Sequence, residues 1–198
     1  NAAYGFDSNN MFIDGVGGRL LFWDGEKWHY REPNTIHDLF CMWGADINNI
    51  HSVGGEGTYR FYDGKQFQRR DELTEEEVSL YGVWGFAAND VYIAGSHGTI
   101  LHYDGNEEGE WVSMESGTEE YLLGIWGSSS TDIFAVGDNA TILHYDGKSW
   151  TPMDTRTEKY LTKVRGLSSD CVYAVGDDGL VIRYDGEQWI DMSLGGNG

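Results

Sequence analysis

The sequence is poor in proline, cysteine and basic residues. Of its 198 residues only 2 are Pro and 2 are Cys, and 13 Lys and Arg stand against 33 Asp and Glu, a formal net charge of −20. A surface this acidic excludes nucleic acid and anionic membranes as default partners, because both are polyanions. No apolar run approaches the roughly 18 residues of a membrane-spanning helix, so no membrane insertion is expected. No signal-peptide pattern is present, and an opening at Asn1 suggests a processed or excised segment.

Glycine and aromatic residues, by contrast, are abundant. The chain has 28 Gly and 8 Trp, and aromatic residues make up 14% of it. Many turn formers and many aromatics, with almost no proline, favour short β-strands joined by tight hairpins. The aromatic content also argues against disorder in spite of the charge.

One unit recurs five times along the chain. Its first marker is a glycine after an aromatic residue or arginine: Gly5, Gly44, Gly85, Gly127 and Gly166. Its second is the glycine that ends a short apolar run: Gly15, Gly54, Gly95, Gly137 and Gly176. Its third is the aspartate of an Asp-Gly pair: Asp24, Asp63, Asp104, Asp146 and Asp185. The first two markers are always 10 residues apart, the second and third always 9, and successive copies begin 39, 41, 42 and 39 residues apart.

The constant spacing predicts hydrogen-bonded hairpins, because a one-residue slip would turn every side chain to the wrong face of the sheet. Each unit fits four antiparallel strands, which is the pattern of a propeller blade. We therefore predict an all-β, five-bladed β-propeller in which residues 1–198 form a single domain. The expected blades are about 1–31, 32–71, 72–114, 115–154 and 155–198. No strand is left to exchange between the ends, so the ring is expected to close by packing of blade one on blade five. The alternative is an open stack, or part of a larger ring.

The fourth copy carries a family resemblance. It reads W-G-S-S-S-T-D-I-F-A-V-G-D-N-A-T-I-L-H-Y-D-G-K-S-W. This resembles the W-G…D-[IV]-[FY]-A-V-G repeats of secreted bacterial β-propellers. It is similar, more distantly, to the Asp-box repeats of bacterial sialidases and to the propeller of photosystem II assembly factors. The Asp-box pattern S-x-D-x-G-x-T-W differs, since Asp and Gly are adjacent here. The resemblance implies a binding scaffold outside the cell or at its surface.

Several repeated polar residues are predicted to be structural. The Asp-Gly aspartates suit turns, and the tryptophans that follow them, such as Trp150, are expected in the core. The six histidines form no ligand spacing, and His102 and His144 occupy one repeated position. Cys41 and Cys171 fall in blades that are not neighbours, so we expect two free, mostly buried thiols.

Acidic and aromatic residues around the blade connections are the best functional candidates. The connections between blades and the turns in the middle of each blade are expected on one face, at the mouth of the central channel. The ligand-binding candidates on this face are Asp38, Glu77, Glu119, Glu120, Glu158, Asp138, Asp177, Asp178, Tyr81, Tyr121 and Tyr160. Converging carboxylates of this kind are suited to Ca²⁺, to a cationic ligand or to a basic protein surface. The alternative is a solvated acidic surface.

Two functions remain open on these residues. The first is a non-catalytic, lectin-like binding module with a shallow acidic face for a glycan, a protein or a cation. It needs no cofactor, although Ca²⁺ is a candidate, and it is a monomer or part of a larger secreted chain. The second is a glycan-active hydrolase that uses carboxylates at the channel mouth, with Asp38, Glu77 and Glu120 as candidates. Blades of nearly equal length, which build no deep cleft, favour the binding module.

Overall fold

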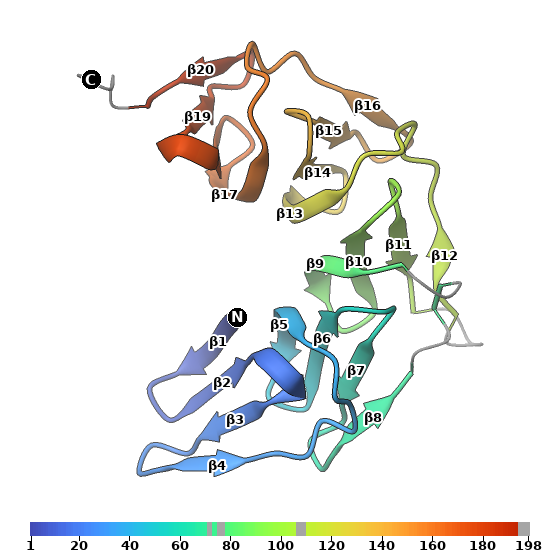
Figure 1. Cartoon of the computed structure of the whole chain (residues 1–198), viewed down its shortest axis with the longest axis vertical. Coiled ribbons are helices and arrows are strands. Elements are labelled where there is room, and N and C mark those ends of the chain that lie inside the picture. The colour runs from blue at the N-terminus through green and yellow to red at the C-terminus, as the bar shows by residue number, and fades with distance from the viewer. Residues whose placement is uncertain (71–72, 75–77, 106–109, 194–198) are drawn as a thin grey trace.

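The computed structural model describes residues 1–70, 73–74, 78–105 and 110–193. These residues form five separate antiparallel sheets of four strands, and each sheet is made of four consecutive strands (Figure 1). Blades 1 and 2 contain β1 (Ala2–Asp7), β2 (Asn10–Asp14), β3 (Leu20–Trp23) and β4 (Trp28–Tyr30), then β5 (Leu39–Asp46), β6 (Asn49–Gly54), β7 (Tyr59–Tyr62) and β8 (Phe67–Arg69). Blade 3 contains β9 (Leu80–Ala87), β10 (Asp90–Gly95), β11 (Ile100–Tyr103) and β12 (Val112–Ser113). Blades 4 and 5 contain β13 (Leu122–Ser129), β14 (Asp132–Gly137), β15 (Ile142–Tyr145) and β16 (Trp150–Pro152), then β17 (Leu161–Ser168), β18 (Cys171–Gly176), β19 (Val181–Tyr184) and β20 (Trp189–Asp191).

The predicted all-β fold of five blades is confirmed. The only helical pieces in the described residues are two short 3-10 turns, η1 (Val16–Gly18) and η2 (Asp177–Gly179). None of the described residues belongs to a helix that is long and apolar enough to cross a membrane. A further short helical turn, suggested by the capping pattern of Thr74 and Glu77, falls largely on residues outside the described ones.

The Asp-Gly pairs form the turn between the third and fourth strand of a blade. In blade 4 the Asp146 side chain accepts hydrogen bonds from the backbone N–H groups of Lys148 and Ser149, at 2.9 and 3.0 Å. Gly147 follows with a φ of 91°, a left-handed conformation that favours glycine. Asp24, Asp63 and Asp185 make the same pair of bonds. The prediction of a structural role for these aspartates is confirmed.

Neighbouring blades pack through alternate residues of their second strands. In blade 4, Phe134 and Val136 of β14 lie in one core with Val172 and Ala174 of β18 in blade 5. The other face of the same strand presents Ile133 and Ala135, which share a core with Tyr92 and Ala94 of blade 3. We call the residue three places before the second marker glycine the forward position, because it faces the following blade. Its occupants are Phe12, His51, Tyr92, Phe134 and Tyr173.

The ring does not close as expected. The inner strands pack in the order β1, β5, β9, β13 and β17, and among the described residues no comparable packing joins blade 5 to blade 1. Figure 1 shows the five blades as an arc that is open between β17 and β1. The side chains at the ends agree, because Tyr173 and Val175 of blade 5 and Ile13 of blade 1 are all exposed. The prediction of closure by packing of blade one on blade five is therefore wrong, and the open alternative describes the arrangement.

Candidate functional site

The blade connections and the mid-blade turns lie on one face, as predicted. In blades 2 to 5, the turn after the second strand donates a backbone hydrogen bond to the connection that precedes the same blade. The bonds run from Gly55 to Asp38, from Ser96 to Ser79, from Asp138 to Tyr121 and from Asp177 to Tyr160, at 2.9 to 3.1 Å. We call this surface, made of the starts of β5, β9, β13 and β17 and the turns after β6, β10, β14 and β18, the turn face.

Aromatic rings from three successive blades form a row on the turn face. Phe40 of β5 stacks on Tyr81 of β9 with ring centres 5.5 Å apart. Tyr81 stacks in turn on Tyr121, just before β13, at 6.2 Å. His97, in the turn after β10, meets the ring of Tyr121 edge-on at 5.3 Å. Of the predicted residues, Tyr81 and Tyr121 are thus brought together, and Phe40 and His97 join them without having been predicted.

Three of the predicted carboxylates gather beside this row. Asp138, in the turn after β14, has a pKa above its usual value, first because of partial burial and then because of the negative charges of Glu120 and Asp177. Glu120 is half-buried, while Asp177 is exposed to solvent. The three residues come from two blades, so their negative charges concentrate at the boundary between blades 4 and 5. This cluster is therefore able to attract a cation but costs free energy when it is empty.

The other predicted residues are more dispersed. Asp38 accepts a 2.7 Å hydrogen bond from the backbone N–H of Gly17, so its carboxylate ties blade 2 to the turn of blade 1. Asp178 is paired with Lys159 at 3.5 Å. Glu119, Glu158 and Tyr160 are exposed on the connections. Glu77 lies outside the described residues. Within the ranges that the structure describes, no group of three or more His, Cys, Asp or Glu is arranged to hold a metal ion, and Ca²⁺ binding stays a prediction.

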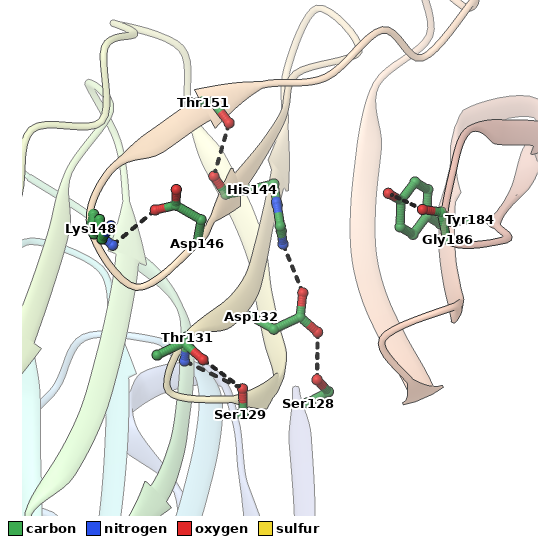
Figure 2. Close-up of polar contacts among 10 residues, drawn as sticks. All are labelled: Ser128, Ser129, Thr131, Asp132, His144, Asp146, Lys148, Thr151, Tyr184 and Gly186. Atoms are coloured by element: carbon green, nitrogen blue, oxygen red, sulfur yellow. Dashed lines mark hydrogen bonds and ion pairs between the residues drawn. The ribbon is translucent and has the colours of Figure 1, made fainter.

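The Asp–His pairs, which lie at the ends of the strands away from the turn face, were not predicted from the sequence. His144 Nε2 of β15 lies 2.7 Å from Asp132 Oδ1 of β14, and His102 makes the same contact with Asp90 at 2.8 Å. Figure 2 shows that Ser128 also bonds to Asp132, so the carboxylate stands between the hydroxyl and the imidazole. A serine nucleophile needs the imidazole as its direct neighbour. The pairs are consequently ties between strands, which the recurrence of Asp and His at fixed repeat positions would have indicated.

The two cysteines are free, as predicted. Cys41 is buried in blade 2, whereas Cys171 of blade 5 is only partly buried. Cys171 occupies the repeat position of Asp132, and Arg183 occupies that of His144; the neighbouring Cys171 side chain is the main cause that raises the pKa of Arg183. Blade 5 thus places a thiol and a guanidinium at the two repeat positions that hold the Asp–His pair in blade 4.

Five repeated four-stranded sheets, which pack face to face and share a common turn face, define a β-propeller. The sequence matches no protein-family model and no curated protein. Among solved structures, the chain is similar to YCF48 bound to D1 peptide, with a TM-score of 0.73, 15% identity, and coverage of 92% of this chain and 63% of that one. It is also similar to the WD40 repeats of RRP9, with a TM-score of 0.76, 10% identity, and coverage of 96% and 64%.

A third similar structure is YCF48 from Cyanidioschyzon merolae, with a TM-score of 0.71, 13% identity, and coverage of 91% and 65%. The chain therefore spans 63–65% of the length of these three structures. At 10–15% identity the likeness establishes the fold alone. The resemblance to propellers is confirmed at that level, while a secreted bacterial origin stays a prediction.

Proposed function

We propose that this chain is a non-catalytic propeller that binds an extended, positively charged polypeptide along its turn face. The observation that carries the proposal is the row of rings at Phe40, Tyr81 and Tyr121, with the carboxylates of Glu120 and Asp138 beside it. Aromatic rings offer apolar area and attract cations to their faces, and the neighbouring carboxylates pair with lysine or arginine. The combination suits a peptide that alternates apolar and basic side chains.

The polypeptide class is supported in two further ways. The row crosses three blades, so a ligand must be extended to use all of it. One of the similar structures, YCF48, is described as bound to D1 peptide, which supports a peptide on this fold. The net charge of −20 favours a basic partner and speeds its association. We place this function at the cell surface or outside the cell, in line with the sequence resemblance.

The test is a fluorescence-anisotropy screen of extended 12-residue peptides that differ only in their Lys and Arg content. We expect basic peptides to bind and acidic peptides to fail. Tyr121→Ala and Asp138→Asn should each weaken binding by about tenfold, the size of one good ring or charge contact. Matched controls are Tyr30→Ala, an exposed tyrosine on β4, and Glu187→Gln, in an Asp-Gly turn, and both should bind as the parent does.

Two results would contradict the proposal. Equal losses in the turn-face variants and in the two controls would place the binding elsewhere. Selective binding on a glycan array, with no peptide bound, would replace the polypeptide by a sugar ligand. Running that array with and without Ca²⁺ also tests the predicted cation.

A further inference from the structure

The two ends of the arc expose side chains whose counterparts in the other blades are buried or partly buried. In blade 5, Tyr173 at the forward position and Val175 two residues later are 38% and 39% exposed, whereas Phe134 and Val136 at the same repeat positions of blade 4 are fully buried. In blade 1 the uncovered side is the opposite one. Trp28 there is 42% exposed, although Trp150 at the same repeat position is 7% exposed.

In blade 5, buried and exposed side chains alternate along one strand, β18. Along β18 burial alternates, with Val172 and Ala174 buried on one side and Tyr173 and Val175 exposed on the other. Along β14 both sides are buried. Both faces of β18 therefore have the apolar residues of a blade–blade interface, but only one of them is covered.

We propose that these two end faces are halves of blade–blade interfaces, and that each receives a further four-stranded blade of the same repeat. The uncovered face of blade 5 is equivalent to the faces that form the four blade–blade interfaces already present in the molecule. Phe134 and Val136 are buried against Val172 and Ala174 of the next blade, so a blade with small apolar residues at those positions fits Tyr173 and Val175.

The face of blade 1 takes the complementary side of such a blade. Ile13 stands at the repeat position of Ala135 and Ala174, which face the preceding blade and are buried there. Trp28 stands at the position of Trp150 and Trp189, both of which lie in cores shared with the preceding blade. A preceding blade that offers an aromatic forward residue, as Tyr92 and Phe134 do, would cover both.

The lengths of the similar structures favour further blades, rather than a second copy of the chain, as the partners of the two end faces. The three similar structures share 91–96% of this chain, yet the chain spans only 63–65% of them. The opening in Figure 1 lies between β17 and β1 of one arc. If the first blade of a second copy docked on blade 5, the other four blades of that copy would continue the arc and collide with blade 1. Single blades fill the opening without that conflict.

The experiment adds one blade in the same polypeptide. Residues 1–193 are followed by a second copy of residues 155–193, so that the copied Val172 and Ala174 meet the original Tyr173 and Val175. We expect the melting temperature to rise above that of residues 1–198. We also expect the fluorescence of the dye ANS to stay close to that of residues 1–198, because the added blade covers one apolar end face and exposes an identical one.

A matched pair of substitutions locates the new interface. Val175→Glu in the original blade 5 should lower the melting temperature of the extended chain strongly, since the carboxylate becomes buried there. The same change in the copied blade, which is now the uncovered end, should have little effect.

Three outcomes would overturn the proposal. One is an added blade that stays unfolded by circular dichroism, since the covered face should template it. Another is a folded added blade in which the two Val175→Glu changes have equal effects. The last is a dimer of residues 1–198 by light scattering at micromolar concentration that Val175→Glu returns to monomer, because a second copy would then be the occupant.

Discussion

Blades 4 and 5 have the same strands, turns and register but different surroundings. The eight-residue inner strands β13 and β17 pair with their second strands at equivalent positions, bulges included. Blade 4 lies between two neighbours and buries both faces of β14, whereas blade 5 has one neighbour and buries one face of β18. The repeat therefore specifies a two-faced blade whether or not both faces are covered, and position in the arc decides what each side chain contributes to stability.

The largest test of this difference uses the forward position. Phe134→Ala should destabilise the fold by about 3–5 kcal/mol, as expected for a large, fully buried aromatic side chain. Tyr173→Ala, at the same position of blade 5, should cost less than about 1 kcal/mol because Tyr173 is 38% exposed and, in the described part of the chain, no following blade packs on it. Urea unfolding of both variants measures the two free energies. Equal costs would mean that the face of blade 5 is covered in solution.

A second test uses His51, the forward residue of blade 2. Burial lowers the pKa of His51 to about 3, and the positive charge of Arg70 acts in the same direction. The unfolded chain binds this proton below about pH 6.5, and the folded chain does not, so stability is lost as the pH falls from about 6.5 toward 3. The slope from this group alone is about 1.4 kcal/mol per pH unit.

His51→Phe places the residue of blades 1 and 4 at this position and should remove that slope. The matched control is His144→Phe, on the partly exposed Asp132 pair, which should leave the slope in place. Urea unfolding at pH 5 and pH 7 distinguishes the variants. An unchanged pH dependence in His51→Phe would show that protonated His51 is tolerated inside the stack.

The contribution of an Asp-Gly turn to stability should not depend on the position of its blade in the arc. Hydrogen bonds from the backbone hold the pKa values of Asp146 and Asp185 below their usual range. Asp146→Ala and Asp185→Ala remove those bonds from an interior and an end blade, and each should lower the melting temperature by about 2–4 °C. The loss should shrink as the pH falls through the lowered pKa, because the native carboxylate is then protonated too. Differential scanning calorimetry at pH 7 and pH 3 checks both points, and a much larger loss in blade 4 would contradict a purely local role.

The smallest expected effect belongs to the turn face. The raised pKa of Asp138 means that its ionised form is disfavoured in the folded chain, through burial and the charges of Glu120 and Asp177. Asp138→Asn should therefore raise stability at pH 7 by no more than about 0.5 kcal/mol, given solvent screening, and change nothing once the pH is below the pKa of the unfolded carboxyl. Thermal unfolding in low salt measures the gain. A loss of stability would mean that the carboxylate is paired rather than repelled.

The register of every blade was predictable because hairpins forbid insertions. The spacings of 10 and 9 residues between markers fixed the strands around Gly137 to within one or two residues. The angle between neighbouring blades was not predictable. The repeat pattern shows which residues face a neighbouring blade, but the angle depends on how those side chains pack in three dimensions. That is why closure between blades 1 and 5 was expected and is not found.

The candidate site was predictable in location but not in composition. The shared face followed from the topology of the blade, and Tyr81, Tyr121, Glu120 and Asp138 were placed on it. Phe40 escaped notice because it lies inside an apolar run, where a ring is expected in the core. Contact between rings of successive blades depends on side-chain direction across an interface, and spacing within one unit carries no information about that.

The construction of each sheet from four consecutive strands has a consequence for how the molecule folds. Every strand pairs only with the one before or after it, so each loop that must close is short and sheet formation is local. Among the described residues, the main packing between strands of different blades runs from one blade to the next, which makes the chain behave as a row of coupled units. Folding can thus start in any blade and spread in both directions. Hydrogen exchange should in turn be slowest in blade 3 and fastest in the two blades that have a single neighbour.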